Sequence, residues 1–232
     1  HYQPIIDQET GQLSSMEALL RWPHPKEGMI PPEEFIPIAE ATGLILPLGE
    51  YVLRKVCNQI RSWEDMGLEG FRVAVNISAR QFEADVSALV QDAMATSGIK
   101  PSALTIEITE GLAMKNVEHY TTMLEDLRRL GVNISMDDFG TGYSSLSYLK
   151  RFPLTTLKID RSFIKDLHLD EDDKEITKAI IAMGQSLNLA TLAEGVENEA
   201  QVKVLRDYGC DYIQGYYYSK PIPAAEMTEY LR

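Results

Sequence analysis

The stretch "ISMDDFGTGYSSL", residues 134–146, places two neighbouring aspartates at the end of an apolar run and follows them with glycines and hydroxyl residues. The alternating apolar side chains before Asp137 are typical of a β-strand, whereas Gly140 and Gly142 are typical of a turn. Adjacent carboxylates repel each other, and a strand interior disfavours both. The purpose of Asp137 and Asp138 therefore depends on what the rest of the chain places beside them.

Composition and length favour one large globular domain. The chain has 232 residues, of which 44% are hydrophobic and 25% are charged. We expect residues 1–232 to form a single domain that has been excised from a larger protein, and α/β barrels are common single domains of this size. The apolar runs are interrupted too often to predict a transmembrane helix.

The charge and the cysteines limit the partners and the compartment. The net charge of −13 argues against nucleic acid polymers and anionic membranes as partners, and predicts that cations mediate the binding of any anionic substrate. Cys57 and Cys210 match no C-x-x-C pattern, which favours a reduced, cytoplasmic compartment. The four histidines are scattered, so a zinc site is not expected.

Strand-like and helix-like segments alternate along the chain, and this pattern predicts a TIM-like (β/α)8 barrel. The link at residues 8–11 is too short for a crossover helix, so the first strand should pair as a hairpin and run antiparallel. Four of the expected helices cover residues 32–41, 48–66, 79–98 and 117–130. The eight predicted strands cover residues 2–7, 13–22, 71–78, 103–110, 132–138, 155–160, 189–194 and 211–215.

Polar side chains gather at the carboxyl ends of the predicted strands, which is the end of such a barrel where active sites form. Because side chains alternate along a strand, the apolar face of each strand should meet the helices and the polar face should line the interior. Glu17 and Arg21 share one face of their predicted strand and can both point into the mouth. The other polar strand ends are Asn76, Glu107, Asp137, Lys158, Glu194 and Gln214.

Several carboxylates buried together need cations, and oxygen ligands favour Mg²⁺ or Mn²⁺ over zinc. Adjacent aspartates are then understandable: one carboxylate would bridge two metals while its neighbour binds the second, and Asp138 reaches the same side as Asp137 only by leaving the regular pleat. For a single motif the alternative readings stay open. An isolated pair of aspartates before a glycine is usually a turn or a helix cap, and Lys158 is equally consistent with a structural ion pair.

The motifs together resemble the EAL-domain cyclic-di-GMP phosphodiesterases of bacterial signalling proteins. The resemblance extends over essentially the whole chain, and its ordered motifs are far more specific than one tripeptide. They are "YQPI", "EALLRW", "VNISARQF", "EITE", "DDFGTGYSSL", "LKIDRSFI", "AEGVE" and "QGYYYSKP".

The resemblance implies a role for each matching residue. The ligands of two metal ions would be Glu17, Asn76, Glu107, Asp137, Asp138 and Glu194. Glu194 would also act as the general base or hold the attacking water, and Lys158 would position that water. Substrate contacts would come from Gln3, Arg21 and Gln214. Glu110, with the loop 138–146, would shape the second metal site and connect it to a dimer interface.

The activity implied by the resemblance is hydrolysis of cyclic di-GMP to linear 5′-pGpG, with Mg²⁺ or Mn²⁺ as cofactor and Ca²⁺ supporting binding without turnover. The first alternative is a catalytically inactive cyclic-di-GMP receptor, which the intact acidic set argues against. The second is another metal-dependent barrel hydrolase. We also expect a homodimer whose association strengthens with metal and substrate, since Gly140 and Gly142 allow the loop to move and Ser144 and Ser145 precede a helical stretch.

Overall fold

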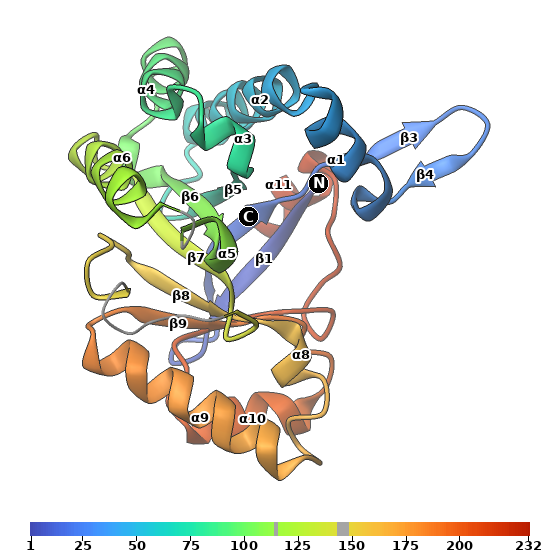
Figure 1. The fold of residues 1–232 in the computed structure, drawn as a ribbon. Helices are drawn as coiled ribbons and strands as arrows, with labels where there is room; N and C mark the ends of the chain where they lie inside the picture. Colours follow the sequence, from blue (N-terminus) through green and yellow to red (C-terminus); the bar gives the residue numbers. More distant parts are fainter. Residues whose placement is uncertain (114–115, 143–148) are drawn as a thin grey trace.

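The computed structural model describes residues 1–113, 116–142 and 149–232, and it contains a closed eight-stranded barrel surrounded by helices (Figure 1). The barrel strands are β1 (Tyr2–Asp7), β2 (Leu13–Ala18), β5 (Arg72–Asn76), β6 (Leu104–Thr109), β7 (Asn133–Phe139), β8 (Thr156–Ile159), β9 (Ala190–Ala193) and β10 (Tyr212–Gln214). Their order around the barrel is β1, β10, β9, β8, β7, β6, β5 and β2. The predicted TIM-like barrel is confirmed.

The first strand runs antiparallel to both of its neighbours, as predicted, while the other strands pair in parallel. A tight turn follows β1, and local chemistry explains it. The Asp7 carboxylate accepts hydrogen bonds from the amides of Glu9 and Thr10 at 3.0 and 2.8 Å. Gly11 then adopts a φ of 69°, which a glycine reaches without strain.

The helices pack on the outside of the barrel through apolar faces. They are α1 (Pro32–Thr42), α2 (Ile45–Asp65), α3 (Ala79–Phe82), α4 (Val86–Ser97), the 3-10 turn η1 (Pro101–Ala103), α5 (Glu110–Ala113), α6 (Val117–Arg129), α8 (Arg161–Ile164), α9 (Glu171–Ser186), α10 (Glu199–Asp207) and α11 (Ala224–Tyr230). In α2 the buried Leu53, Val56, Ile60 and Trp63 recur every three or four residues, which is the spacing of one helix face. In the described ranges, no helix is both long and apolar enough to cross a membrane.

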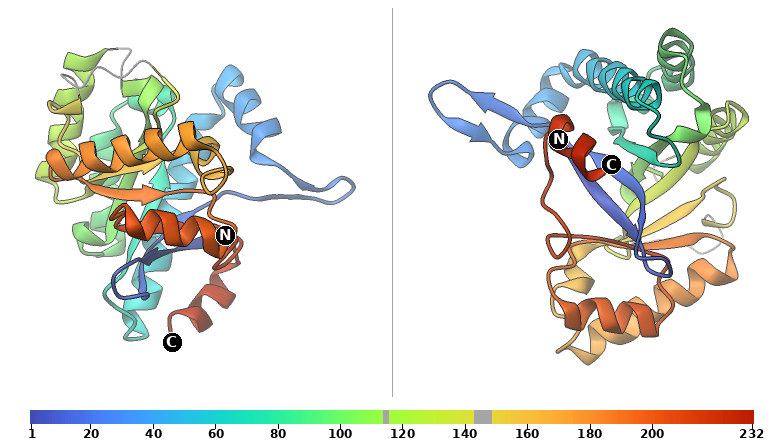
Figure 2. Two further views of the ribbon diagram at one scale, coloured as in Figure 1. Left: turned by 90° about the horizontal axis from the view of Figure 1, so that it is seen from below. Right: turned by 180° about the vertical axis from the view of Figure 1, so that it is seen from behind.

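Two boundaries predicted from the sequence are wrong. The strand expected over 13–22 leaves the barrel after Ala18, and Trp22–His24 forms β3, which pairs with β4 (Gly28–Ile30) in a hairpin that projects from the barrel (Figure 2). Pro23 has no amide hydrogen to donate to a barrel ladder, so the apolar alternation around it is misleading.

The helix expected over 79–98 is divided into α3 and α4. A capping box between Ser78 and Gln81 begins α3. Asp85 then accepts a hydrogen bond from the amide of Ala88 at 3.0 Å and begins α4. Two N-cap signals therefore lie within what looked like one periodic run.

The predicted division between the two faces of the strands is confirmed. Ile106, Ile134 and Leu157 are fully buried in the apolar core beneath the helices. The alternate residues include Glu107 and Ser135, which line a small internal cavity of about 30 Å³. The barrel interior is therefore polar toward its carboxyl end.

Candidate active site

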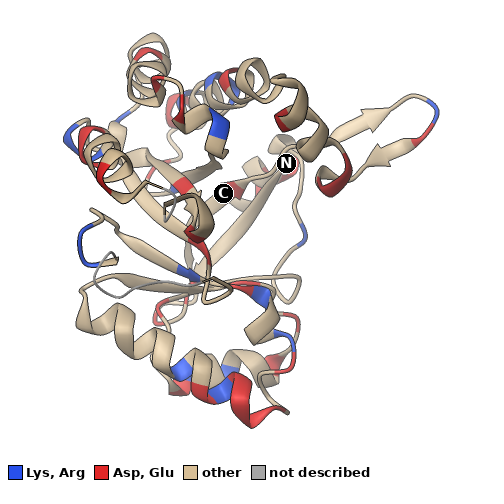
Figure 3. Ribbon diagram, in the orientation of Figure 1, with Lys and Arg blue, Asp and Glu red and all other residues tan. Residues whose placement is uncertain are grey.

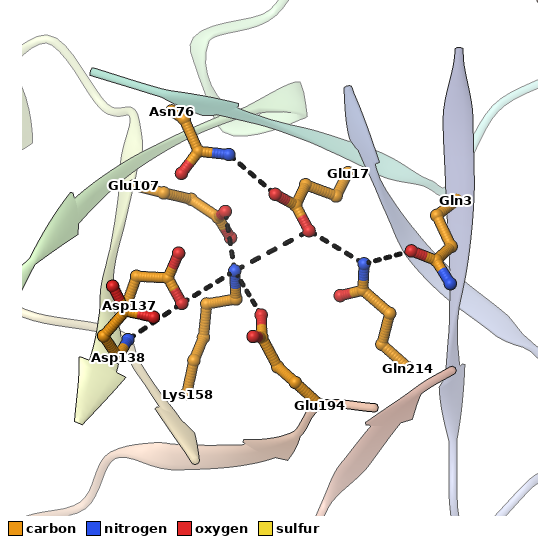
Figure 4. A network of polar contacts seen from close by, with 9 residues as sticks. All are labelled: Gln3, Glu17, Asn76, Glu107, Asp137, Asp138, Lys158, Glu194 and Gln214. Atoms are coloured by element: carbon orange, nitrogen blue, oxygen red, sulfur yellow. Dashed lines mark hydrogen bonds and ion pairs between the residues drawn. The ribbon is translucent and has the colours of Figure 1, made fainter. Parts of the chain in front are cut away.

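Nine of the residues named from the sequence converge at one mouth of the barrel, formed by the carboxyl ends of the parallel strands and the amino end of the antiparallel β1 (Figure 4). Neighbouring parallel strands bring them together, because Asn76 pairs in register with Glu107 and Thr109 pairs with Asp137. The contributors are Gln3 on β1, Glu17 on β2, Asn76 on β5, Glu107 on β6, Asp137 and Asp138 on β7, Lys158 on β8, Glu194 directly after β9 and Gln214 on β10.

Lys158 lies at the centre of this carboxylate cluster and is 1% exposed. Its Nζ is 2.5 Å from Glu194 Oε1, 2.8 Å from Glu107 Oε2, 3.1 Å from Asp137 Oδ1 and 3.7 Å from Glu17 Oε2. Burial lowers the pKa of Lys158, but the surrounding carboxylates outweigh burial and raise it well above its ordinary value. The ammonium is therefore charged at every physiological pH.

One ammonium does not neutralise four carboxylates, and the pKa values of Glu17, Glu107 and Glu194 shift in different directions. Burial raises the pKa of Glu107 well above its ordinary range despite Lys158, with repulsion from Glu17 and Asp137 adding to it. Burial also raises the pKa of Glu194 to about 8. For Glu17 burial is outweighed by Lys158 and by hydrogen bonds, so its pKa falls below the ordinary value. The site therefore holds protons near neutral pH and has room for more positive charge.

Amide side chains hold Glu17 in place. Gln214 Nε2 donates to Glu17 Oε2 at 2.8 Å and to Gln3 Oε1 at 3.1 Å, and Asn76 Nδ2 donates to Glu17 Oε1 at 2.6 Å. Gln3 in turn donates to the carbonyl of Ser219 at 3.1 Å. Three predicted site residues thus orient one carboxylate that was also predicted from the sequence.

The expected departure of Asp138 from the pleat is present. The β7–β8 register shifts between Met136 and Phe139, and Asp138 has a φ of 55°, which is unusual for a non-glycine residue. Its amide donates to Asp137 Oδ1 at 2.9 Å, and Figure 4 shows the two residues side by side. Burial raises the pKa of Asp138, and Asp137 and Asp160 add to the increase.

Asp160 also belongs to the surroundings of the site, because its charge raises the pKa of Asp138. It is not among the site residues predicted from the sequence. Asp160 caps α8 by accepting from the amide of Ser162 at 2.9 Å. The available signal was its position two residues after Lys158, on the same predicted strand face.

Arg21 does not share a strand face with Glu17, which corrects the sequence prediction, because β2 ends at Ala18. Its Nη1 donates to the carbonyl of Leu20 at 2.9 Å. Arg21 lines a cavity of about 310 Å³ together with Asn76, whereas Gln3 and Glu17 line a second cavity of about 250 Å³. The arginine therefore lies beside the carboxylate cluster and not within it.

Glu110 lies directly after β6 and is 2% exposed. The amide of Gly140 donates to Glu110 Oε2 at 2.9 Å. A Cβ atom at Gly142 would lie 2.5 Å from Glu110 Oε1, so only glycine fits there without displacing the carboxylate. Glu110 thus holds the first part of the predicted loop. Residues 143–146, which include Ser144 and Ser145, lie outside the described residues.

The donors present fit a hard divalent cation in their chemistry. They are carboxylate and amide oxygens with excess negative charge, which is the set that Mg²⁺ and Mn²⁺ prefer. Within the described ranges, no three Asp, Glu, His or Cys side chains are already arranged as a metal cage. The ammonium of Lys158 lies among the carboxylates instead.

Comparison with known proteins assigns the family. The family profile described as the EAL domain matches residues 1–221. The chain belongs to the EAL domain family. The resemblance inferred from the motifs is therefore confirmed.

The EAL domain is similar to parts of longer curated proteins. The bifunctional diguanylate cyclase/cyclic di-GMP phosphodiesterase MucR of Pseudomonas aeruginosa is 48% identical over 228 residues, which cover 98% of this chain and 33% of that protein. The cyclic di-GMP phosphodiesterase NbdA of the same organism is 46% identical over 233 residues, which cover 100% of this chain and 30% of that protein. The chain thus spans about a third of the length of these relatives.

Solved EAL structures share the fold. A complex of the MucR phosphodiesterase with c-di-GMP matches with a TM-score of 0.95 at 48% identity, covering 98% of this chain and 92% of that chain. The EAL domain of Mycobacterium smegmatis DcpA matches with a TM-score of 0.83 at 34% identity, covering 100% of this chain and 94% of that chain. Both likenesses extend over nearly the entire EAL domain.

Proposed function

We propose that this EAL domain hydrolyses one phosphodiester bond of cyclic di-GMP and releases linear 5′-pGpG. The observation that supports the proposal most strongly is the convergence of buried carboxylates around Lys158 at the carboxyl end of the barrel. Similar relatives carry the name cyclic di-GMP phosphodiesterase, and one similar structure is a c-di-GMP complex.

The carboxylate cluster would hold two Mg²⁺ or Mn²⁺ ions. When bound, these ions supply a water molecule of lowered pKa and stabilise the charge on the phosphoryl oxygens. The residues proposed to hold the ions are Glu17, Asn76, Glu107 and Asp137 for the first, and Asp137, Asp138 and Glu194 for the second. The hydrogen bonds from Gln214 and Asn76 keep Glu17 ionised and oriented for this role.

Lys158 and Glu194 would handle the attacking water. The raised pKa of Lys158 keeps it a hydrogen-bond donor that can orient the water and stabilise developing negative charge. Glu194 would accept the proton of the water. In the metal-free site burial raises its pKa to about 8. Added positive charge nearby lowers the pKa of Glu194 and makes the ionised base available.

Substrate contacts would come from Arg21, Gln3 and Gln214. Arg21 offers a permanent positive charge at the cavity that it shares with Asn76. We also propose a homodimer linked to the second metal site through Glu110, and a Ca²⁺ form that binds substrate without turnover. The linkage is reciprocal, so metal occupancy and dimer association strengthen each other.

The test is incubation of the purified domain with cyclic di-GMP and Mg²⁺ or Mn²⁺, followed by chromatographic separation of the nucleotides. We expect 5′-pGpG from the native domain. Glu17→Ala should abolish turnover with little change in melting temperature, and Glu226→Ala on the exposed part of α11 should change neither. Tight binding with no product would identify a receptor, and hydrolysis only of linear dinucleotides or glycerophosphodiesters would identify a different hydrolase.

A further inference from the structure

A cavity of about 250 Å³ opens beside the carboxylate cluster, and its walls are strongly acidic. Acidic residues also outnumber basic ones in the whole chain, 35 to 22, and lie on helices and strand ends alike (Figure 3). Glu17, Asp137, Glu194 and Glu197 all line the cavity. Of the lining residues in the described part of the chain, Arg161 alone carries a positive charge.

The fold fixes the stem of Arg161 at this wall. Asp160 caps the start of α8, and Arg161 is the first residue of that helix. Gly195, which follows Glu194, has a φ of +69°, and a Cβ there would lie 2.7 Å from the Cβ of Arg161. The glycine therefore lets the arginine pack directly against the backbone next to Glu194.

Among the residues that the structure describes, the guanidinium group of Arg161 has no hydrogen-bond or ion-pair partner. Lys158, by contrast, contacts four carboxylates. Arg21 lines the neighbouring cavity of about 310 Å³ and not this one. Of the described residues that line this cavity, Arg161 is thus the cation that can bind an anionic ligand.

We propose that Arg161 binds the non-reacting phosphate of the cyclic dinucleotide and so contributes to substrate specificity. The inference rests on the proposed function. A cyclic dinucleotide carries two phosphodiesters, and only one is hydrolysed at the carboxylate cluster. The other is an anion that enters an acidic cavity in a domain of net charge −13, so it needs a protein cation. A guanidinium binds phosphate oxygens in a bidentate manner.

The first test uses Arg161→Gln, which keeps much of the stem and removes the charge. We expect the KM for cyclic di-GMP to rise roughly tenfold to a hundredfold, as for a lost hydrogen-bonded charge, while kcat changes less than about twofold. Arg161→Lys should recover part of the loss, because it restores a point charge without the planar fork. The matched control is Arg206→Gln in the last turn of α10, which should leave both constants unchanged.

Two further measurements separate a charge contact from a structural role. The affinity of the native domain should fall more steeply with ionic strength than that of Arg161→Gln, because the variant lacks one ionic contact. Bis(p-nitrophenyl) phosphate has a single phosphodiester, so its turnover should be the same for both proteins. An unchanged affinity for cyclic di-GMP, or an equal loss with both compounds, would overturn the inference.

Failure of the proposed function gives a different result. A native domain that binds cyclic di-GMP without hydrolysing it fails as an enzyme, yet calorimetric titration still tests Arg161. Weaker binding by Arg161→Gln together with a shallower salt dependence supports the phosphate contact in that case. Equal binding by the two proteins rejects it.

Discussion

Replacing Lys158 by methionine should convert the centre of the site into a cluster of uncompensated buried carboxylates. Methionine preserves most of the length of the side chain and removes the charge. In the native domain the Nζ of Lys158 lies within 3.1 Å of Glu107, Asp137 and Glu194. Breaking a buried ion pair by removing one partner costs about 3–5 kcal/mol. For a domain of this size that corresponds to a decrease in melting temperature of roughly 6–20 °C.

The stability lost in Lys158→Met should depend on pH, and the titration of the neighbouring carboxyl groups decides whether the loss grows or shrinks as pH rises. Without the lysine, burial and mutual repulsion raise the pKa values of Glu107 and Glu194 further above their ordinary value of 4.5. The folded variant must then keep protons that the unfolded chain releases, so its stability falls as pH rises. The difference between variant and native domain should therefore be small near pH 5 and large near pH 8.

Thermal unfolding with a chelator present, at both pH values, measures this difference. Addition of Mg²⁺ should reduce the deficit at the higher pH, since divalent cations replace the lost charge. The matched control is Lys174→Met on α9, whose exposed ion pair with Glu171 should contribute nothing measurable. An equal deficit at both pH values would refute the electrostatic reasoning and indicate that Lys158 acts through packing alone.

Three further predictions concern neighbouring features. Because the pKa of Glu194 is raised to about 8 in the folded, metal-free domain, melting temperatures measured with a chelator should fall as pH rises from 4.5 toward 8. A melting temperature that increases over this pH range would contradict the raised pKa of Glu194. Glu110→Ala removes the acceptor for the Gly140 amide, so it should weaken both Mg²⁺ binding, measured by calorimetry, and dimer association, measured by sedimentation. If the dimer dissociation constant is the same with and without Mg²⁺, the loop serves the metal site alone. Gly215→Ala should lower the unfolding free energy by about 2 kcal/mol or more in denaturant titration, since its Cβ would lie 2.0 Å from the carbonyl oxygen of Val196; an unchanged midpoint would exclude the clash.

Several features of the site could be predicted from sequence because they depend on local periodicity. The two-residue period of a strand is sufficient to place Glu107, Asp137 and Lys158 on interior faces, and a single glycine-containing turn after Asp138 indicates where the strand must bend. The order of strand-like and helix-like segments then indicates a barrel, which brings the strand ends to one mouth.

Other features could not be predicted because they depend on where a strand ends. The alternation around Trp22 continues the pattern of β2, yet the chain leaves the barrel after Ala18, so Arg21 lies beside a separate cavity. Asp160 shares a predicted strand face with Lys158, but its influence on Asp138 depends on the bulge in β7. Neither the strand end nor the bulge has a periodic signal.

The sequence by itself determined the family, the order of strands, the antiparallel first strand and the identity of the acids at the strand ends. These follow from the ordered motifs, from side-chain alternation and from a turn too short for a crossover. Only the tertiary structure placed Lys158 Nζ among four carboxylates and brought Arg161, which has no ion-pair partner in the described part of the chain, to the cavity beside them. Contacts of this kind join residues far apart in the chain, so they depend on how the closed barrel brings strand ends together, which local spacing does not encode.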